Sequence, residues 1–169
     1  MKRGFTLVEL LVVITILMIL SATVLTVLNP VEIVRRAHDT ARITDIENLR
    51  KGIDLAMSDQ NMSLQGTTAT PITGSSNDLR LTRLADGTGW APYNLLADFG
   101  LAKYLAVLPV DPVNDDKYYY RFASDGETFE INCKFESAEY ASRMDSDGGN
   151  DPDWYEIGTN PGLVLLPPS

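Results

Sequence analysis

The chain has 169 residues, of which 44% are hydrophobic and 22% charged, and its 23 acidic residues outnumber its 14 lysines and arginines. The formal net charge of −9 excludes a general nucleic-acid-binding protein, because the phosphate backbone attracts basic surfaces. With Cys133 as its single cysteine, the chain cannot form an internal disulfide, the fastening on which small extracellular domains often rely.

A long apolar run opens the chain. From Phe5 to Leu28 the only ionisable side chain is Glu9, and Lys2 and Arg3 come just before the run. As a helix with ~1.5 Å rise per residue, the run is about 36 Å long, enough to cross a hydrocarbon core of ~30 Å. The positive-inside rule places the N-terminus in the cytoplasm and the rest of the chain outside. A carboxylate deep in such a helix costs roughly 2.5–3.5 kcal/mol, and intramembrane charges usually have a partner or a function. The alternative for the isolated chain is that Glu9 lies near the helix end and reaches the lipid headgroups.

The residues from Lys2 to Ile14 resemble the class III leader of type IV prepilins and type II secretion pseudopilins. They combine a short basic leader, Gly before Phe, and Glu as the fifth residue after that Gly. The resemblance implies that a prepilin peptidase cuts between Gly4 and Phe5 and methylates the new amine, and that Glu9 acts in filament assembly. A cationic Phe5 amine and the Glu9 carboxylate of a neighbouring copy attract strongly in low dielectric, where either charge alone is penalised.

Two other interpretations of the apolar run stay open. One is a secretory signal peptide with a poor small-residue cleavage site at Ser21-Ala22-Thr23, although Glu9 inside the apolar region argues against it. The other is a plain N-terminal membrane anchor, which would make the chain a monomeric binding module that keeps its leader.

A second helix is predicted to follow the apolar run. Asn29-Pro30-Val31-Glu32 has the pattern of a helix start, with Asn at the N-cap and Pro at the first helical position. We therefore expect a kink or a short unwound link at residues 26–30. Beyond it, Ile46, Leu49 and Ile53 recur at steps of three and four, which predicts an amphipathic helix that ends near Ser58.

The polar residues of this second helix suggest no catalytic chemistry. Asp39 and Arg42 lie three positions apart and are expected to form a helical ion pair worth a few tenths of a kcal/mol. His38, beside Asp39, favours a surface or subunit-contact role over catalysis or metal binding. The sequence contains no convincing Ser/His/Asp, Cys/His or phosphate-binding Gly set, so no catalytic residue is predicted and an enzyme is the least favoured class.

The rest of the chain predicts a small antiparallel sheet. Residues 65–78 are polar and rich in turn formers, which indicates a surface loop, and residues 95–105 suit a short helix broken at Gly100. Strands are predicted over 118–123, 128–136 and 154–157, with a hairpin turn at 124–127. In the second predicted strand Cys133 falls on the apolar face and is predicted to be a small buried residue.

The predicted fold class is therefore α+β and pilin-like, with a long N-terminal helix, half membrane-spanning and half amphipathic, packed on a small antiparallel β-sheet. The predicted division is a leader at 1–4, a transmembrane and filament-core helix at 5–29, an amphipathic helix at 30–58, and a globular head with a C-terminal sheet and an acidic loop at 59–169.

An aspartate-rich loop is the best candidate site of the head. Its candidate calcium ligands are Asp145, Asp147, Asp151 and Asp153, because calcium binds several oxygen ligands that such a loop can supply. The loop is not an EF-hand, since Gly149 and its neighbour do not match the template. It resembles major pseudopilins, which carry a calcium-binding loop near the C-terminus and lack a disulfide. A solvated acidic turn without metal stays open as the alternative.

The resemblance implies a structural subunit of a type IV pilus-like filament. Its partners would be further copies of itself in a helical filament, the prepilin peptidase, the inner-membrane assembly machinery, and membrane lipid before assembly, with no direct nucleic-acid binding. It would cross the cell membrane once, with its C-terminal domain outside, and then enter an extracellular or periplasmic filament. A type II secretion pseudopilus subunit is the alternative, which the aspartate-rich loop and the single cysteine favour.

Overall fold

The computed structural model describes residues 4–78, 82–159 and 165–166. The chain divides into two compact units, Met1–Arg35 and Arg36–Ser169, and the boundary between them falls inside the second helix. Lys2 and Arg3, which the sequence places in the leader, lie outside the described residues. Helices and antiparallel strands make up the described chain, so the predicted α+β class is confirmed.

The first unit contains helix α1, Leu7–Leu28, and the start of α2. Within the described residues, one stretch, Leu7–Val24, is long and apolar enough to cross a membrane. The helix ends at Asn29, which adopts a left-handed conformation with φ 38° and ψ 75°. Helix α2 then begins at Pro30, where the missing amide costs nothing because first-turn amides have no helical partner. The expected interruption at residues 26–30 is thus a single non-helical residue.

The second unit holds most of α2, Pro30–Ser58, and a five-stranded antiparallel sheet of order β2-β3-β5-β6-β7. The strands are β2 (Gly66–Thr67), β3 (Thr70–Ser75), β5 (Arg121–Ser124), β6 (Phe129–Cys133) and β7 (Tyr155–Gly158). A separate pair joins β1 (Met62–Leu64) to β4 (Tyr93–Leu95). Short helices η1 (Gly100–Lys103) and α3 (Ala138–Met144) complete the head.

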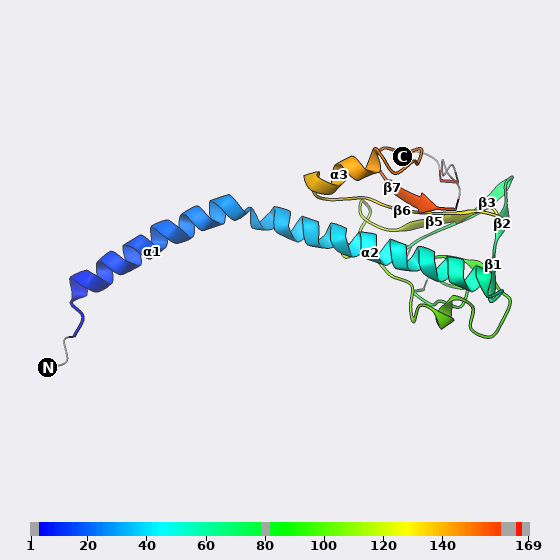
Figure 1. Ribbon diagram of the computed structural model, residues 1–169, viewed down its shortest axis with the longest axis horizontal. Helices are drawn as coiled ribbons and strands as arrows, with labels where there is room; N and C mark the ends of the chain where they lie inside the picture. The colour runs from blue at the N-terminus through cyan, green and yellow to red at the C-terminus, as the bar shows by residue number, and fades with distance from the viewer. Residues whose placement is uncertain (1–3, 79–81, 160–164, 167–169) are drawn as a thin grey trace. The chain divides into compact units, whose positions relative to one another are not determined.

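The core forms where the apolar stripe of α2 meets the sheet. Ile46 and Leu49 are fully buried against a cluster that includes Phe122 and Ile131, and Figure 1 shows α2 running alongside the sheet. Burying such side chains contributes about 1.5–3 kcal/mol each, so this contact holds the helix to the head. Cys133 is buried in the same cluster, as predicted, and burial raises the pKa of its thiol well above the usual range.

Two predictions about the middle of the chain are wrong. The expected surface loop at residues 65–78 instead forms β2 and β3, because its threonines and Ile72 suit an extended edge hairpin turned at 68–69. The expected broken helix at 95–105 is the end of β4 followed by η1. Gly100 has φ 47°, and a Cβ atom there would lie 2.5 Å from the Tyr93 hydroxyl, so the chain turns tightly at this position.

Candidate functional site

The predicted processing site lies in exposed, non-helical chain. Gly4, Phe5 and Thr6 precede α1, and all three are exposed. A Cβ atom added at Gly4 would meet nothing within 4 Å, so the peptide bond between Gly4 and Phe5 is open to an approaching enzyme. These two residues therefore lie in the kind of segment that a peptidase can bind in extended form.

Glu9 closes a capping box at the start of α1. Its carboxylate accepts hydrogen bonds from the Thr6 amide and the Thr6 hydroxyl, both at 2.9 Å, and the Glu9 amide donates to the Thr6 hydroxyl at 3.2 Å. This arrangement satisfies backbone donors that the first turn of a helix leaves free, and it places a negative charge at the positive end of the helix dipole. In the single chain Glu9 is thus held by Thr6.

The four candidate calcium ligands lie on one loop after α3 but differ in their exposure and their hydrogen bonds. Asp145 and Asp153 are exposed, whereas Asp147 is half-buried and Asp151 is buried. The Asp147 carboxylate accepts hydrogen bonds from the amides of Gly149 and Glu156, both at 2.8 Å. These bonds tie the loop to strand β7.

Glu156, which the sequence analysis did not include among the site residues, is at the centre of this loop. Its carboxylate accepts hydrogen bonds from the Asp151 amide at 3.1 Å and from the Asn132 side chain at 3.0 Å. A Cβ atom at Gly149 would lie 1.7 Å from a Glu156 carboxylate oxygen, so a larger residue there would displace the Glu156 side chain. The signal in the sequence was the alternation of β7, which places Glu156 opposite Asn132 in the sheet.

The loop offers the oxygen ligands that calcium prefers, but its carboxylates do not form a preformed coordination site. All four aspartates offer carboxylate oxygens, the ligand type that calcium prefers. Among residues 4–78, 82–159 and 165–166, however, no group of three or more His, Cys, Asp or Glu side chains is arranged to hold a metal ion. Calcium binding would therefore require carboxylates such as Asp147 to exchange amide partners for the ion, or to use their second lone pairs.

A buried polar layer lies on the sheet face that carries Glu156. Arg121 stacks on the Trp154 ring, with its guanidinium carbon 3.8 Å from the ring centroid, and Lys134 lies 4.7 Å from the same centroid. Glu130, which is fully buried, accepts hydrogen bonds from the Leu165 and Leu166 amides at 2.9 and 3.2 Å. Burial, together with the nearby Glu156 carboxylate, raises the pKa of Glu130 to about 7.

The largest polar cluster of the head is centred on Arg42, whose side chain is fully buried. Its guanidinium donates to both oxygens of Asp111, at 2.6 and 2.8 Å, and to Asp39 at 2.8 Å. It also lies 2.7 Å from the Glu136 carboxylate. Although burial opposes the charge, the hydrogen bonds that Arg42 donates to Asp111 and the other carboxylates, and their negative charge, outweigh burial and raise the pKa of Arg42.

Asp39 extends this cluster to the chain that enters α3. Its carboxylate accepts hydrogen bonds from the Glu136 and Ser137 amides, at 2.9 and 2.8 Å, and from the Ser137 hydroxyl at 2.6 Å. His38 Nδ1 lies 2.9 Å from the Glu136 carboxylate at the rim of the cluster. The expected ion pair of Asp39 and Arg42 is therefore confirmed, at 2.8 Å. It is fully buried and joins three separate parts of the head, so its structural weight exceeds that of the simple helical pair that was predicted.

Comparison with known proteins bears on the N-terminal segment. Residues 1–25 match the family model described as the prokaryotic N-terminal methylation motif. No curated protein and no solved structure matches the chain. The motif match confirms the resemblance to class III prepilin leaders and indicates a type IV pilin-like or pseudopilin protein, a structural class rather than an enzyme class.

Proposed function

We propose that the chain is a structural subunit of a type IV pilus-like filament, cut between Gly4 and Phe5 and polymerised through α1. The observation that carries this proposal is the methylation motif at residues 1–25, which coincides with an exposed processing site and a capped Glu9. Before assembly α1 lies in lipid, and afterwards it packs among copies of itself. Both surroundings are apolar, so the transfer requires little change in solvation.

Glu9 is the residue that links processing to assembly in this proposal. Cutting after Gly4 creates an amine at Phe5, only one residue before Thr6, which already holds the Glu9 carboxylate in the single chain. The carboxylate of one copy then pairs with the Phe5 amine of its neighbour. Each charge is costly alone in an apolar filament core, so their pairing favours the assembled register.

The test is the intact mass and N-terminal residue of the protein extracted from its own cell membrane. A chain that begins at N-methylated Phe5 is expected. A chain that still begins at Met1 would instead support an anchored module, and a start near Thr23 would support a secreted protein.

A type II secretion pseudopilus subunit is the second candidate. The aspartate-rich loop from Asp145 to Asp153 and the lack of a second cysteine favour it. In this version calcium binds to Asp145, Asp147, Asp151 and Asp153 and fastens the end of the head. If the chain forms a pilus, deleting the retraction motor should change its filaments. If it forms a pseudopilus, deleting the secretin and its secretion partners should abolish its function in secretion.

A further inference from the structure

The head exposes several large apolar side chains around the C-terminal end of α2. Phe99 is 66% exposed, Leu96 58% and Leu55 52%. The Leu96 amide donates a 3.0 Å hydrogen bond to the Asn61 carbonyl, just beyond the end of α2, which fixes the segment against the helix. Clustered exposed apolar side chains of this size mark an interaction surface more often than a free surface.

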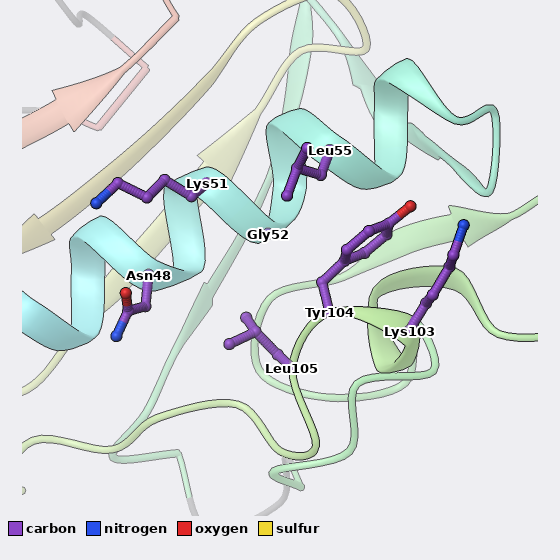
Figure 2. Close-up of a pocket in the computed structure, with 7 residues that line it drawn as sticks. All are labelled: Asn48, Lys51, Gly52, Leu55, Lys103, Tyr104 and Leu105. Atoms are coloured by element: carbon purple, nitrogen blue, oxygen red, sulfur yellow. The ribbon is translucent and has the colours of Figure 1, made fainter.

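A groove of about 520 Å³, which Leu55 helps to line, lies between α2 and residues 103–105. Figure 2 shows its lining residues: Asn48, Lys51, Gly52, Leu55, Lys103, Tyr104 and Leu105. Gly52 lets the two segments approach, because a Cβ atom there would lie 3.0 Å from a Leu105 methyl carbon. Leu55 and Leu105 supply the aliphatic part of the lining, and the volume of the groove can hold an apolar side chain of a partner.

The charged residues that line the groove are both lysines. Lys51 and Lys103 lie toward opposite ends in Figure 2, with Leu55 and Leu105 between them. Each lysine has one carboxylate near it, Glu47 at 3.6 Å and Asp59 at 2.7 Å. Since an ammonium group has three donors, each retains capacity for a second carboxylate. The groove thus fits an apolar side chain flanked by negative charge.

The turn before β5, residues 111–116, combines an exposed apolar side chain with carboxylates. Val113 is 39% exposed, and Asp115 and Asp116 follow it as exposed carboxylates. The turn is rigid, because the Asp111 carboxylate accepts hydrogen bonds from the Val113 and Asn114 amides at 2.9 and 3.3 Å. A preordered turn loses little conformational entropy when it docks.

One copy cannot place its own turn in its own groove. Asp111 is fixed to Arg42, whereas the helical part of the groove runs from Asn48 to Leu55 on another face of α2. At ~1.5 Å per residue, these positions are about 9–20 Å apart along the helix axis. A contact between two different surfaces of identical chains is heterologous, and it propagates into a helical polymer when its rotation does not close into a ring.

We propose that the groove between α2 and residues 103–105 binds the Asp111–Asp116 turn of a second copy, with Val113 against the aliphatic part of the lining and Asp115 and Asp116 near the two lysines. This inference rests on the proposed filament function, for which it supplies a contact between heads.

The test is site-specific cross-linking in filaments of the full chain. Cys133 is fully buried, so introduced cysteines are the reactive ones. In filaments of the Leu55→Cys/Val113→Cys double variant, a short bis-maleimide should produce a ladder of covalent multimers. Neither single variant should produce it, and the matched pair Leu55→Cys/Leu84→Cys should also remain monomeric, because Leu84 is equally exposed but lies outside the turn.

The outcomes separate this contact from the filament function itself. Filaments without a ladder, dimers from Leu55→Cys alone, or capture of another protein would overturn the contact while leaving the filament proposal standing. If the double cysteine variant does not assemble, a charge-reversal pair tests the contact instead. Lys51→Glu should lower filament yield several-fold, and adding Asp116→Lys should restore it, whereas failure of this rescue would overturn the contact. A wild-type chain that is processed but never forms filaments would overturn both proposals.

Discussion

Arg42 on α2 donates two hydrogen bonds to the Asp111 carboxylate, at 2.6 and 2.8 Å, between residues that are 69 positions apart in the chain. Both side chains are fully buried. Paired guanidinium–carboxylate hydrogen bonds fix the orientation of both groups, so this contact sets the position of the turn before β5 relative to α2. The same guanidinium reaches Asp39, which holds the chain that enters α3.

Replacing Arg42 should destabilise the head strongly. Arg42→Met leaves the Asp39 and Asp111 carboxylates buried without their cation, and removing one partner of a buried ion pair typically costs about 3–5 kcal/mol. Urea unfolding of the full chain in detergent would measure this loss. The matched control is Arg50→Met, whose ion pair with Asp54 is half-exposed at 3.8 Å and should change stability by less than about 1 kcal/mol. Equal effects of the two substitutions would contradict a structural role for the cluster.

Removing the Glu9 carboxylate should block assembly without preventing membrane insertion. Glu9→Ala takes away the charge that pairs with the neighbouring Phe5 amine, and it makes α1 more apolar. Membrane fractionation and counts of filaments by electron microscopy would check both statements. Abundant normal filaments from Glu9→Ala would refute the charge-pairing argument.

The Thr6 hydroxyl should influence the same step more weakly. Thr6→Val removes the hydroxyl that takes part in two hydrogen bonds of the capping box, and loss of an N-cap costs about 1 kcal/mol. We expect fewer filaments at normal membrane abundance. Thr15→Val is the matched control, because the Thr15 hydroxyl only donates to the Val12 carbonyl within α1. A larger defect from the control would show that capping does not matter for assembly.

Stability should fall as pH rises across the titration of Glu130. Burial raises the pKa of Glu130 to about 7 from an ordinary value of 4.5, so the folded chain binds a proton that the unfolded chain releases. Between these two pH values the free energy of unfolding should decrease, by an amount on the order of 2 kcal/mol. Glu130→Gln keeps a neutral side chain and should remove this component, as measured by urea unfolding at several pH values. The exposed Glu127→Gln should retain the full decrease, and an unchanged profile for Glu130→Gln would count against the buried acid.

Calcium should raise the melting temperature of the full chain if the acidic loop binds it. Binding to the folded state alone stabilises it by about 2.7 kcal/mol at a hundred times the dissociation constant. Replacing the exposed Asp145 and Asp153 by alanine should abolish the shift, while removing equal charge at the exposed Asp98 and Asp116 should preserve it. No shift at millimolar calcium, or the same shift in both double variants, would exclude this loop as the site.

Prediction from sequence worked where the determining residues are contiguous. The leader motif and the helix start at Pro30 are local patterns, and the strand alternation around Cys133 correctly separated the two faces of β6. The edge hairpin of β2 and β3, residues 66–75, was not predicted because turn-forming residues are as frequent in this stretch as its threonines. Stronger weight on β-branched residues would have favoured strands there.

The buried polar groups could not be predicted in the same way. Asp39 and Arg42 show only their mutual spacing of three, while the partners that bury them, Asp111 and Ser137, come from distant turns. Glu130 lies on the polar face of its strand, and what covers it includes the amides of Leu165 and Leu166. Burial of a polar side chain depends on such remote segments, so local periodicity assigns its face but not its surroundings.

A head fastened by Arg42 rather than by a disulfide has a consequence for its biogenesis. Ion pairs and hydrogen bonds form as soon as the chain folds, so the head needs no thiol oxidant or disulfide isomerase. Its only thiol, at Cys133, is buried within the core. The head can therefore fold equally well in reducing and oxidising surroundings.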